Sequence, residues 1–149
     1  MTKEVLIVDD DKAMVNLLST LLETEGFGTE KTRSAAKALE MVSEEHPDLI
    51  LLDIMMPEMD GFKFLAMLRS NPDTRAIPVI ILTVLGDQEN ILEGFRKEAD
   101  EYVTKPFDPQ KLVETIKGVL QRSLEERVGE RARRIEALLA MIRTLEEEG

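Results

Sequence analysis

Charged side chains follow short apolar runs at three points along this chain of 149 residues. If these runs are neighbouring parallel strands, their carboxyl ends meet at one edge of a sheet. Negative charges gathered there repel one another unless a cation lies among them. The pattern therefore predicts a divalent-metal site with one carboxylate free to react. The residues that follow the runs are Asp9, Asp10, Asp11, Asp53 and Lys105.

Five stretches of the sequence have the character of β-strands. Continuous apolar runs are typical of strands that are buried on both faces. Residues 5–8, 49–52 and 79–82 are runs of this kind. Residues 29–32 are predicted as a polar edge strand and residues 102–104 as a fifth strand.

Helical stretches fall between and after these strands. Apolar residues recur at helical spacing in 12–25, 34–45, 62–69 and 88–97, and Asp108-Pro109 begins a fifth helix. The alternation predicts the α/β class, with a doubly wound parallel sheet covered by helices on both faces. On this fold Asp9, Asp10, Asp53, Thr83 and Lys105 all lie at or just past the carboxyl end of a strand.

Composition narrows the class of protein. The net charge of −11 and pI near 4.6 argue against nucleic-acid binding through the bulk surface. There is no cysteine, which excludes disulfides and thiolate metal sites. The chain opens directly into a strand, and it has neither a signal-peptide pattern nor an apolar run long enough to span a bilayer. We expect a cytoplasmic protein that does not bind membranes.

The C-terminal residues differ in kind from the rest. Their apolar side chains follow the alternating three-and-four spacing of a coiled-coil seam, which Arg131 interrupts. The seam consists of Leu124, Val128, Ile135, Leu138, Ile142 and Leu145. We expect a globular domain over residues 1–121 and a helix over 122–149 that dimerises or links. The alternative is a lone amphipathic helix that folds back on the domain.

Four motifs together resemble the receiver domain of two-component response regulators. The resemblance runs from about Lys3 to Leu120, and each motif falls at the end of the proper strand. The motifs are Val8-Asp9-Asp10, residues 52–61 (LDIMMPEMDG), Thr83, and residues 102–107 (YVTKPF). The resemblance implies the five-stranded order 2-1-3-4-5.

The resemblance also implies a role for each residue. Asp53 would accept a phosphoryl group from a histidine kinase or phosphotransfer protein. Mg²⁺ would be held by Asp9, Asp10, Asp53 and the backbone carbonyl of Met55, with Asp9 acting through water. Lys105 and Thr83 would contact phosphate oxygens, and Lys105-Pro106 would be a cis peptide bond.

Switching is also implied. Phosphate on Asp53 would draw Thr83 inward, so that Tyr102 rotates into the vacated space. The surface formed by the fourth helix, fifth strand and fifth helix would change, and a partner or second copy would dock there.

Each of these residues could instead have a purely structural role. Asp11 is suited to cap the first helix, Asp60-Gly61 alone is a turn, and Thr83 alone is an ordinary strand residue. His46 is expected in a loop, exposed to solvent rather than acting as a ligand or phosphodonor. The joint placement of the others at strand ends favours a site.

Two other functions use the same topology. An aspartyl-nucleophile phosphatase would use Asp9 and Asp11 as nucleophile and acid, but it needs a cap region for which this chain has no room. A flavin carrier would need a phosphate loop after Val8, where acidic residues instead repel phosphate. The output also stays open, because the chain is either a stand-alone regulator or a receiver cut from a longer protein.

Three departures from the family pattern carry expectations. Met55 and Leu85 flank the acceptor with apolar side chains that orient no hydrolytic water, which predicts a long-lived phosphoryl group. Val84 replaces a small residue and is expected to restrict the inward swing of Tyr102. Glu98 stands where Gly commonly ends the fourth helix, so we expect a strained or frayed helix end there.

Overall fold

The computed structural model describes residues 2–58 and 60–148. Five strands form one parallel sheet in the order β2-β1-β3-β4-β5, which confirms the predicted fold. The strands are β1 (Glu4–Val8), β2 (Gly28–Thr32), β3 (Leu49–Leu52), β4 (Val79–Thr83) and β5 (Glu101–Thr104). The helices are α1 (Lys12–Thr24), α2 (Ala35–Glu45), α3 (Gly61–Ser70), α4 (Gln88–Arg96), α5 (Pro109–Gln121) and α6 (Leu124–Glu148).

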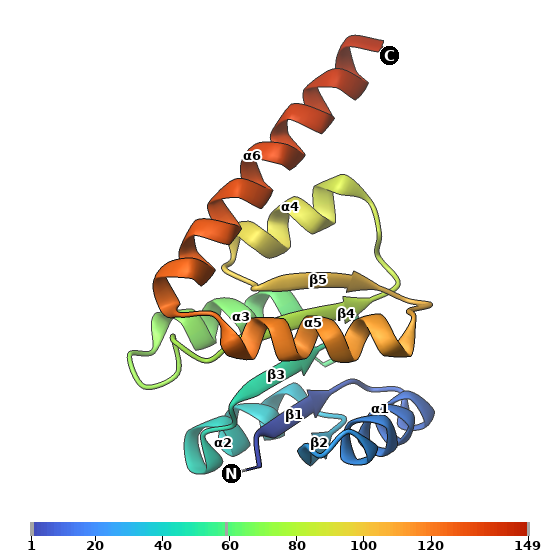
Figure 1. Cartoon of the computed structure of the whole chain (residues 1–149), viewed down its shortest axis with the longest axis vertical. Helices are drawn as coiled ribbons and strands as arrows, with labels where there is room; N and C mark the ends of the chain where they lie inside the picture. The colour runs from blue at the N-terminus through green and yellow to red at the C-terminus, as the bar shows by residue number, and fades with distance from the viewer. Residues whose placement is uncertain (1, 59, 149) are drawn as a thin grey trace.

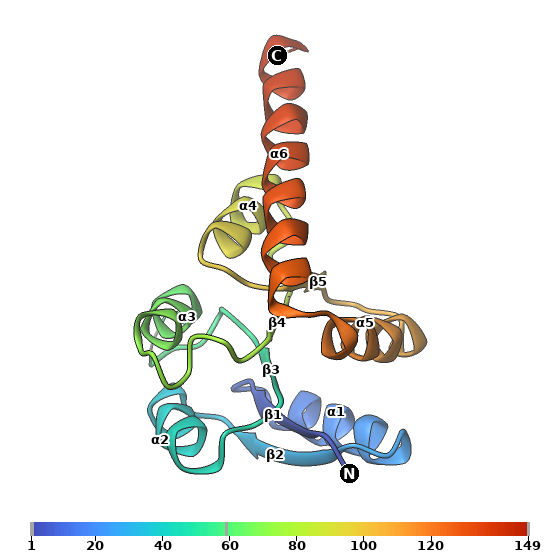
Figure 2. The same cartoon turned by 60° about the vertical axis from the view of Figure 1, so that its left-hand side comes forward.

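The sheet lies between two layers of helices (Figures 1 and 2). Side chains of α2 and α3 pack with alternate strand residues in one core, which includes Phe64, Leu65 and Ile81. Side chains of α1 and α5 pack with the opposite strand residues in a second core, which includes Leu18 and Ile116. The strands β1, β3 and β4 are apolar throughout their middles because they are buried on both faces.

Short acidic or hydroxyl side chains start the helices. Asp11, Ser34 and Asp108 accept hydrogen bonds from the first backbone amides of α1, α2 and α5, which confirms the predicted starts. Asp60 does the same for α3. His46 lies at the end of α2 with a left-handed φ of 48° and is exposed, as expected.

Gly61 is required by a close approach after β3. Its amide donates to the carbonyl of Ile54 at 3.1 Å. A Cβ atom at Gly61 would overlap the backbone Cα of Ile54, so no larger residue fits without a shift. The contact fixes the loop that carries Met55 beside the end of β3. Met59, which the motif of residues 52–61 includes, lies outside the described residues.

The helix α6 turns back after a two-residue connection and packs against α4 (Figures 1 and 2). Ile135, Leu138 and Ile142 of the predicted seam are half-buried, whereas Leu124, Val128 and Leu145 are exposed. Within this single chain the helix therefore follows the fold-back alternative. Within residues 2–58 and 60–148, no helix is both long enough and apolar enough to cross a membrane.

Candidate phosphoryl-acceptor site

Strand register brings the acidic residues together. Val8 pairs with Leu52 in the β1–β3 ladder, so the residues that follow them, Asp9 and Asp53, emerge side by side. Thr83 pairs with Thr104 in the β4–β5 ladder, which places Lys105 next to the end of β4. The predicted convergence at the carboxyl edge is therefore observed.

The distances define a compact charged cluster. One carboxylate oxygen each of Asp9, Asp10 and Asp53 lie within 4.8 Å of one another. Lys105 Nζ donates to Asp9 Oδ2 and to Asp53 Oδ2, both at 2.7 Å. Asp9 and Asp53 are buried and Asp10 is half-buried. Three carboxylates at this separation match the hard oxygen-donor set that Mg²⁺ prefers.

Burial and pairing shift the protonation of the cluster in opposite ways. Burial raises the pKa of Asp9 above its ordinary value, although hydrogen bonds from Lys105 and the Asp11 amide act to lower it. Burial alone would lower the pKa of Lys105, but hydrogen bonds to Asp53 and Asp9 outweigh it and leave that pKa raised. Lys105 is therefore a fixed positive charge, while the carboxylates carry an electrostatic cost that a cation relieves.

Two hydroxyl groups extend the site along β4 and β5. Thr83 is completely buried, and its Oγ1 has no hydrogen-bond partner within the described part of the chain. Buried hydroxyls are rarely left unpaired, so this atom is available to an incoming acceptor oxygen. Tyr102 is half-buried and its hydroxyl donates to the carbonyl of Leu85 at 2.6 Å.

Comparison with known proteins decides the family. Residues 5–117 match the response regulator receiver domain. The chain belongs to this receiver-domain family.

Solved structures of response regulators and receiver domains share the fold over 80–82% of this chain. A putative response regulator from Chloroflexus aurantiacus superposes with a TM-score of 0.78 at 33% identity, over 82% of this chain and 100% of that one. The chemotaxis response regulator CheY4 of Vibrio cholerae gives a TM-score of 0.75 at 29% identity, over 80% and 99% of the two chains. The BeF3-activated DrrB receiver domain gives 0.72 at 34% identity, over 82% and 100%.

Two curated relatives are longer than this receiver. The DNA-binding dual master transcriptional regulator RpaA of Synechocystis is 37% identical over 134 residues, which is 90% of this chain and 55% of RpaA. The transcriptional regulatory protein SrrA of Staphylococcus aureus is 40% identical over 123 residues, 83% of this chain and 50% of SrrA. The receiver thus spans about half the length of these relatives.

The remaining predicted site residues lie around Asp53. The Met55 amide donates to Asp53 Oδ1 at 2.9 Å, so the backbone of Met55 lies beside Asp53, while the residue as a whole is 49% exposed. The Lys105-Pro106 bond is cis, as the resemblance implied. Asp11 accepts from the amides of Ala13 and Met14, so it caps α1 and is not poised as the acid of a phosphatase.

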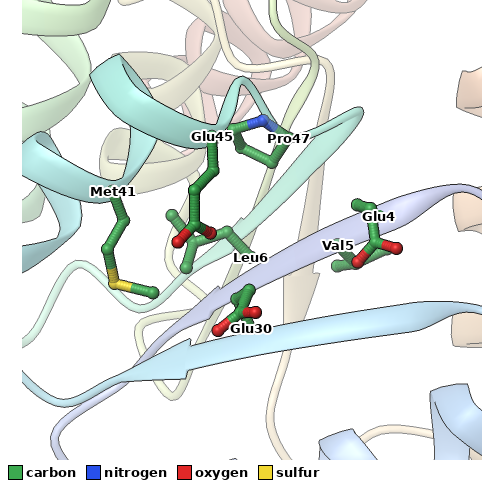
Figure 3. Close-up of a pocket in the computed structure, with 7 residues that line it drawn as sticks. All are labelled: Glu4, Val5, Leu6, Glu30, Met41, Glu45 and Pro47. Atoms are coloured by element: carbon green, nitrogen blue, oxygen red, sulfur yellow. The ribbon is translucent and has the colours of Figure 1, made fainter.

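A separate hollow lies away from this site, toward the amino ends of β1 and β3 (Figure 3). Figure 3 shows the side chains of Glu30, Glu45 and Met41 pointing into the space between α2 and the strands. Its carboxylates have no basic partner among the residues that line it, so the hollow does not suit an anionic ligand.

Sequence reasoning missed a second charged cluster. We call the main-chain carbonyls of Ala76 and Glu98, with the carboxylates of Asp100 and Glu101, the acidic edge. Arginines from α3 and α6 converge on it. The available signal was the spacing of Arg127 and Arg131, four residues apart, at the point where Arg131 interrupts the apolar seam.

We predict that the phenol of Tyr102 ionises only near pH 12. Burial, followed by the negative charges of Asp87 and Asp53, raises its pKa from 10.0 to about 12. Because the folded-state pKa exceeds the unfolded one, the neutral phenol's contribution to stability is complete below pH 10 and is lost as pH rises toward 12. The chain contains one tyrosine, so ultraviolet absorbance of tyrosinate reports this group alone. A midpoint near 10 while circular dichroism still shows folded protein would contradict the burial of this ring.

Proposed function

We propose that this receiver accepts a phosphoryl group from a phosphohistidine onto Asp53 in a Mg²⁺-dependent reaction. The observation that carries the proposal is the pairing of Lys105 Nζ with both Asp9 and Asp53 at 2.7 Å, next to the unpaired hydroxyl of Thr83. A phosphoryl group on Asp53 requires these two functions, a fixed cation and a neutral donor.

Each side chain has a distinct part in the transfer. One oxygen of Asp53 attacks phosphorus, the bond from phosphorus to the donor's imidazole nitrogen breaks, and the freed imidazole regains a proton. Lys105 and Thr83 donate to phosphoryl oxygens as negative charge develops there. When bound, Mg²⁺ would neutralise charge between acceptor and donor; Asp10, Asp53 and the Met55 carbonyl would hold it directly, and Asp9 would hold it through water.

The experiment that tests this function uses the full chain with acetyl phosphate and Mg²⁺. Intact mass should increase by one phosphoryl group, and hydroxylamine should remove it, because an acyl phosphate is a mixed anhydride whose acyl carbon hydroxylamine attacks with loss of phosphate. Chelation of Mg²⁺ should prevent the increase. Failure of the chain to take up phosphate from acetyl phosphate or from a histidine-phosphorylated kinase would overturn the proposal.

We predict that Mg²⁺ raises the thermal stability of the receiver through the carboxylate cluster. An ion that binds only the folded state stabilises it by about 2.7 kcal/mol at 100 times its dissociation constant. Removing the like-charge repulsion in the cluster acts in the same direction. Melting followed by circular dichroism should show the increase in wild type and a much smaller one in Asp10→Asn. Glu45→Gln, which removes a carboxylate from the hollow of Figure 3, is the matched control and should keep the full increase.

We predict that the phosphoryl group on Asp53 persists for minutes or longer. Met55 lies beside Asp53 and Leu85 comes two residues after Thr83, and neither side chain carries a group that could orient an attacking water. Loss of label from purified phosphoprotein should accelerate in Met55→Glu and stay unchanged in Met67→Glu, whose exposed methionine lies on α3. A wild-type half-life of seconds would contradict the prediction.

The partners follow from the same proposal. A sensor histidine kinase or phosphotransfer protein supplies the phosphoryl group, and the surface of α4, β5 and α5 carries the output. RpaA is described as DNA-binding, but this acidic receiver is not proposed to bind nucleic acid itself. We also propose that the chain divides into a receiver at 1–121 and a C-terminal helix at 122–149. A homodimer that involves this helix is part of the same proposal.

A further inference from the structure

The helix α6 packs along α4 and runs antiparallel to it. The guanidinium of Arg134 lies 5.5 Å from the ring centroid of Phe95, near the end of α4. At the beginning of α4, Gln88 Nε2 lies 3.6 Å from the sulfur of Met141. Figures 1 and 2 show that α6 follows α4 and then continues beyond it. The face of the receiver that would carry output is therefore already occupied by a segment of the same chain.

Two buried arginines fasten the first turns of α6 to the acidic edge. Arg127 donates to Asp100 Oδ1 at 2.7 Å, to Asp100 Oδ2 at 3.1 Å and to the carbonyl of Ala76 at 2.7 Å. Arg131 donates to the carbonyl of Glu98 at 2.8 Å. Arg127 and Arg131 are only 6% and 7% exposed. These hydrogen bonds are directed and charge-assisted, so they fix the position of the first turns of α6.

The acidic edge is built to receive them. Glu98 adopts a left-handed φ of 71°, and the amides of Glu98 and Ala99 close the end of α4 onto Phe95 and Gly94. This end is the expected strained one, but it is fully hydrogen-bonded and not frayed. Arg69 of α3 also donates to the Glu98 carbonyl, at 2.8 Å, so the guanidinium groups of Arg69 and Arg131 share this one acceptor.

The remaining contacts of α6 are apolar and lie over α4. Ile135, Leu138 and Ile142 are half-buried on the same side of the helix as Arg131. Leu145, one turn further along α6, is 52% exposed and lies beside Asp87 and Gln88 at the beginning of α4. The helix thus rests on two supports, the acidic edge at its start and the surface of α4 along its middle.

The surface of α4 on which α6 packs is linked to the acceptor site through contacts of Tyr102. A Cβ atom at Gly94 of α4 would lie 2.9 Å from Cδ2 of Tyr102, so this glycine lets the aromatic ring pack directly on the helix. The hydroxyl of Tyr102 is held by the carbonyl of Leu85, two residues after Thr83. A displacement of Thr83 toward a phosphoryl group therefore reaches α4 through Leu85 and Tyr102.

We propose that the acidic edge and the adjoining face of α4 form a receptor site for a helix that carries two arginines one turn apart. In the resting receiver α6 occupies this site as an intramolecular ligand, and phosphorylation of Asp53 releases it. The regulatory half of this inference rests on the proposed function. The released face, together with the freed apolar side of α6, is then available to a second copy of the chain.

The direction of the change follows from the contacts. When Thr83 binds a phosphoryl oxygen, Leu85 moves with it and Tyr102 turns away from Gly94. The helix α4 then loses part of its packing on β5 and shifts under α6. Helix α6 then loses the apolar support that aligns its arginine contacts and leaves the site, because packed interfaces change in steps and do not deform continuously.

A disulfide trap measures whether α6 is docked. The chain has no cysteine, so Gln88→Cys with Met141→Cys introduces the sole pair of thiols at a point of contact. The full chain carrying this pair should cross-link rapidly within one molecule when oxidised. Gln88→Cys with Glu136→Cys is the control pair, because Glu136 is exposed on another side of α6, and it should cross-link slowly.

Two further measurements test separately whether the arginines hold α6 in the receptor site and whether phosphorylation releases it. Arg131→Ala added to the Gln88/Met141 pair should slow cross-linking about fivefold or more without any phosphoryl group, whereas Arg133→Ala should not slow it. Beryllofluoride with Mg²⁺, a stand-in for the phosphoryl group, should slow it by a similar factor in the otherwise unmodified pair. The same addition to Asp53→Asn should have no effect.

Fluorine NMR of bound beryllofluoride makes the possible failures distinguishable. If beryllofluoride does not bind, the proposed function fails. If it binds and cross-linking does not slow, release by phosphorylation is wrong. If Arg131→Ala cross-links as fast as Arg133→Ala, the receptor site itself is wrong.

Discussion

Replacing Asp53 with Asn should abolish acyl-phosphate formation completely. The amide is close in shape to the carboxylate, but it is not an oxygen nucleophile and cannot form the acyl phosphate. The rest of the site is expected to stay in place, because Lys105 keeps Asp9 as its second partner at 2.7 Å. Incubation with labelled acetyl phosphate and Mg²⁺, followed by intact mass and gel autoradiography, measures the loss.

Two companion variants make the result specific. Asp9→Asn should take up label more slowly, because it weakens the cation site without removing the acceptor. Asp73→Asn, in an exposed loop, should label like wild type. If Asp9→Asn eliminated labelling while Asp53→Asn retained it, the nucleophile would be Asp9, as an aspartyl phosphatase requires. That outcome would contradict the receiver assignment of the acceptor.

The sheet and the acceptor site could be predicted because both depend on short-range patterns. The cores of β1, β3 and β4 are continuous apolar runs, and Asp9, Asp10, Asp53 and Thr83 come at or just past the ends of these runs, as Lys105 follows β5. In a parallel sheet this position alone fixes where a residue emerges. Asp9, Asp53 and Lys105 therefore met at one edge as expected, although they are far apart in sequence.

The position of α6 could not be predicted on the same basis. An apolar stripe shows which side of a helix is buried, but it does not identify the surface that buries it. Ile135, Leu138 and Ile142 fit a coiled-coil partner and the face of α4 equally well. The acidic edge was also hidden, since two of its four acceptors are main-chain carbonyls that no side-chain pattern reveals.

Replacing Arg127 with Ala should destabilise the receiver by about 3 kcal/mol, the low end of what is found when one partner of a buried ion pair is removed. The Arg127 side chain is 6% exposed and that of Asp100 is 0% exposed, with 2.7 Å between Nε and Oδ1. The variant leaves Asp100 with Arg69 and the amide of Val79, so the loss is partial. It also leaves the carbonyl of Ala76 without its arginine. Urea unfolding followed by circular dichroism measures the difference.

Arg133→Ala supplies the matched control on the same helix. Arg133 pairs with Glu130 at 2.6 Å, but its side chain is 68% exposed, and exposed pairs contribute about 0–1 kcal/mol. Arg127→Met separates the loss of side-chain packing from the loss of charge and hydrogen bonds. It keeps most of the side-chain volume while it removes the charge and the hydrogen bonds. Coupling in the double variant Arg127→Ala with Asp100→Asn should be large, since the two groups are in direct contact. Equal unfolding free energies for Arg127→Ala and Arg133→Ala would mean that α6 does not rest on the acidic edge in solution.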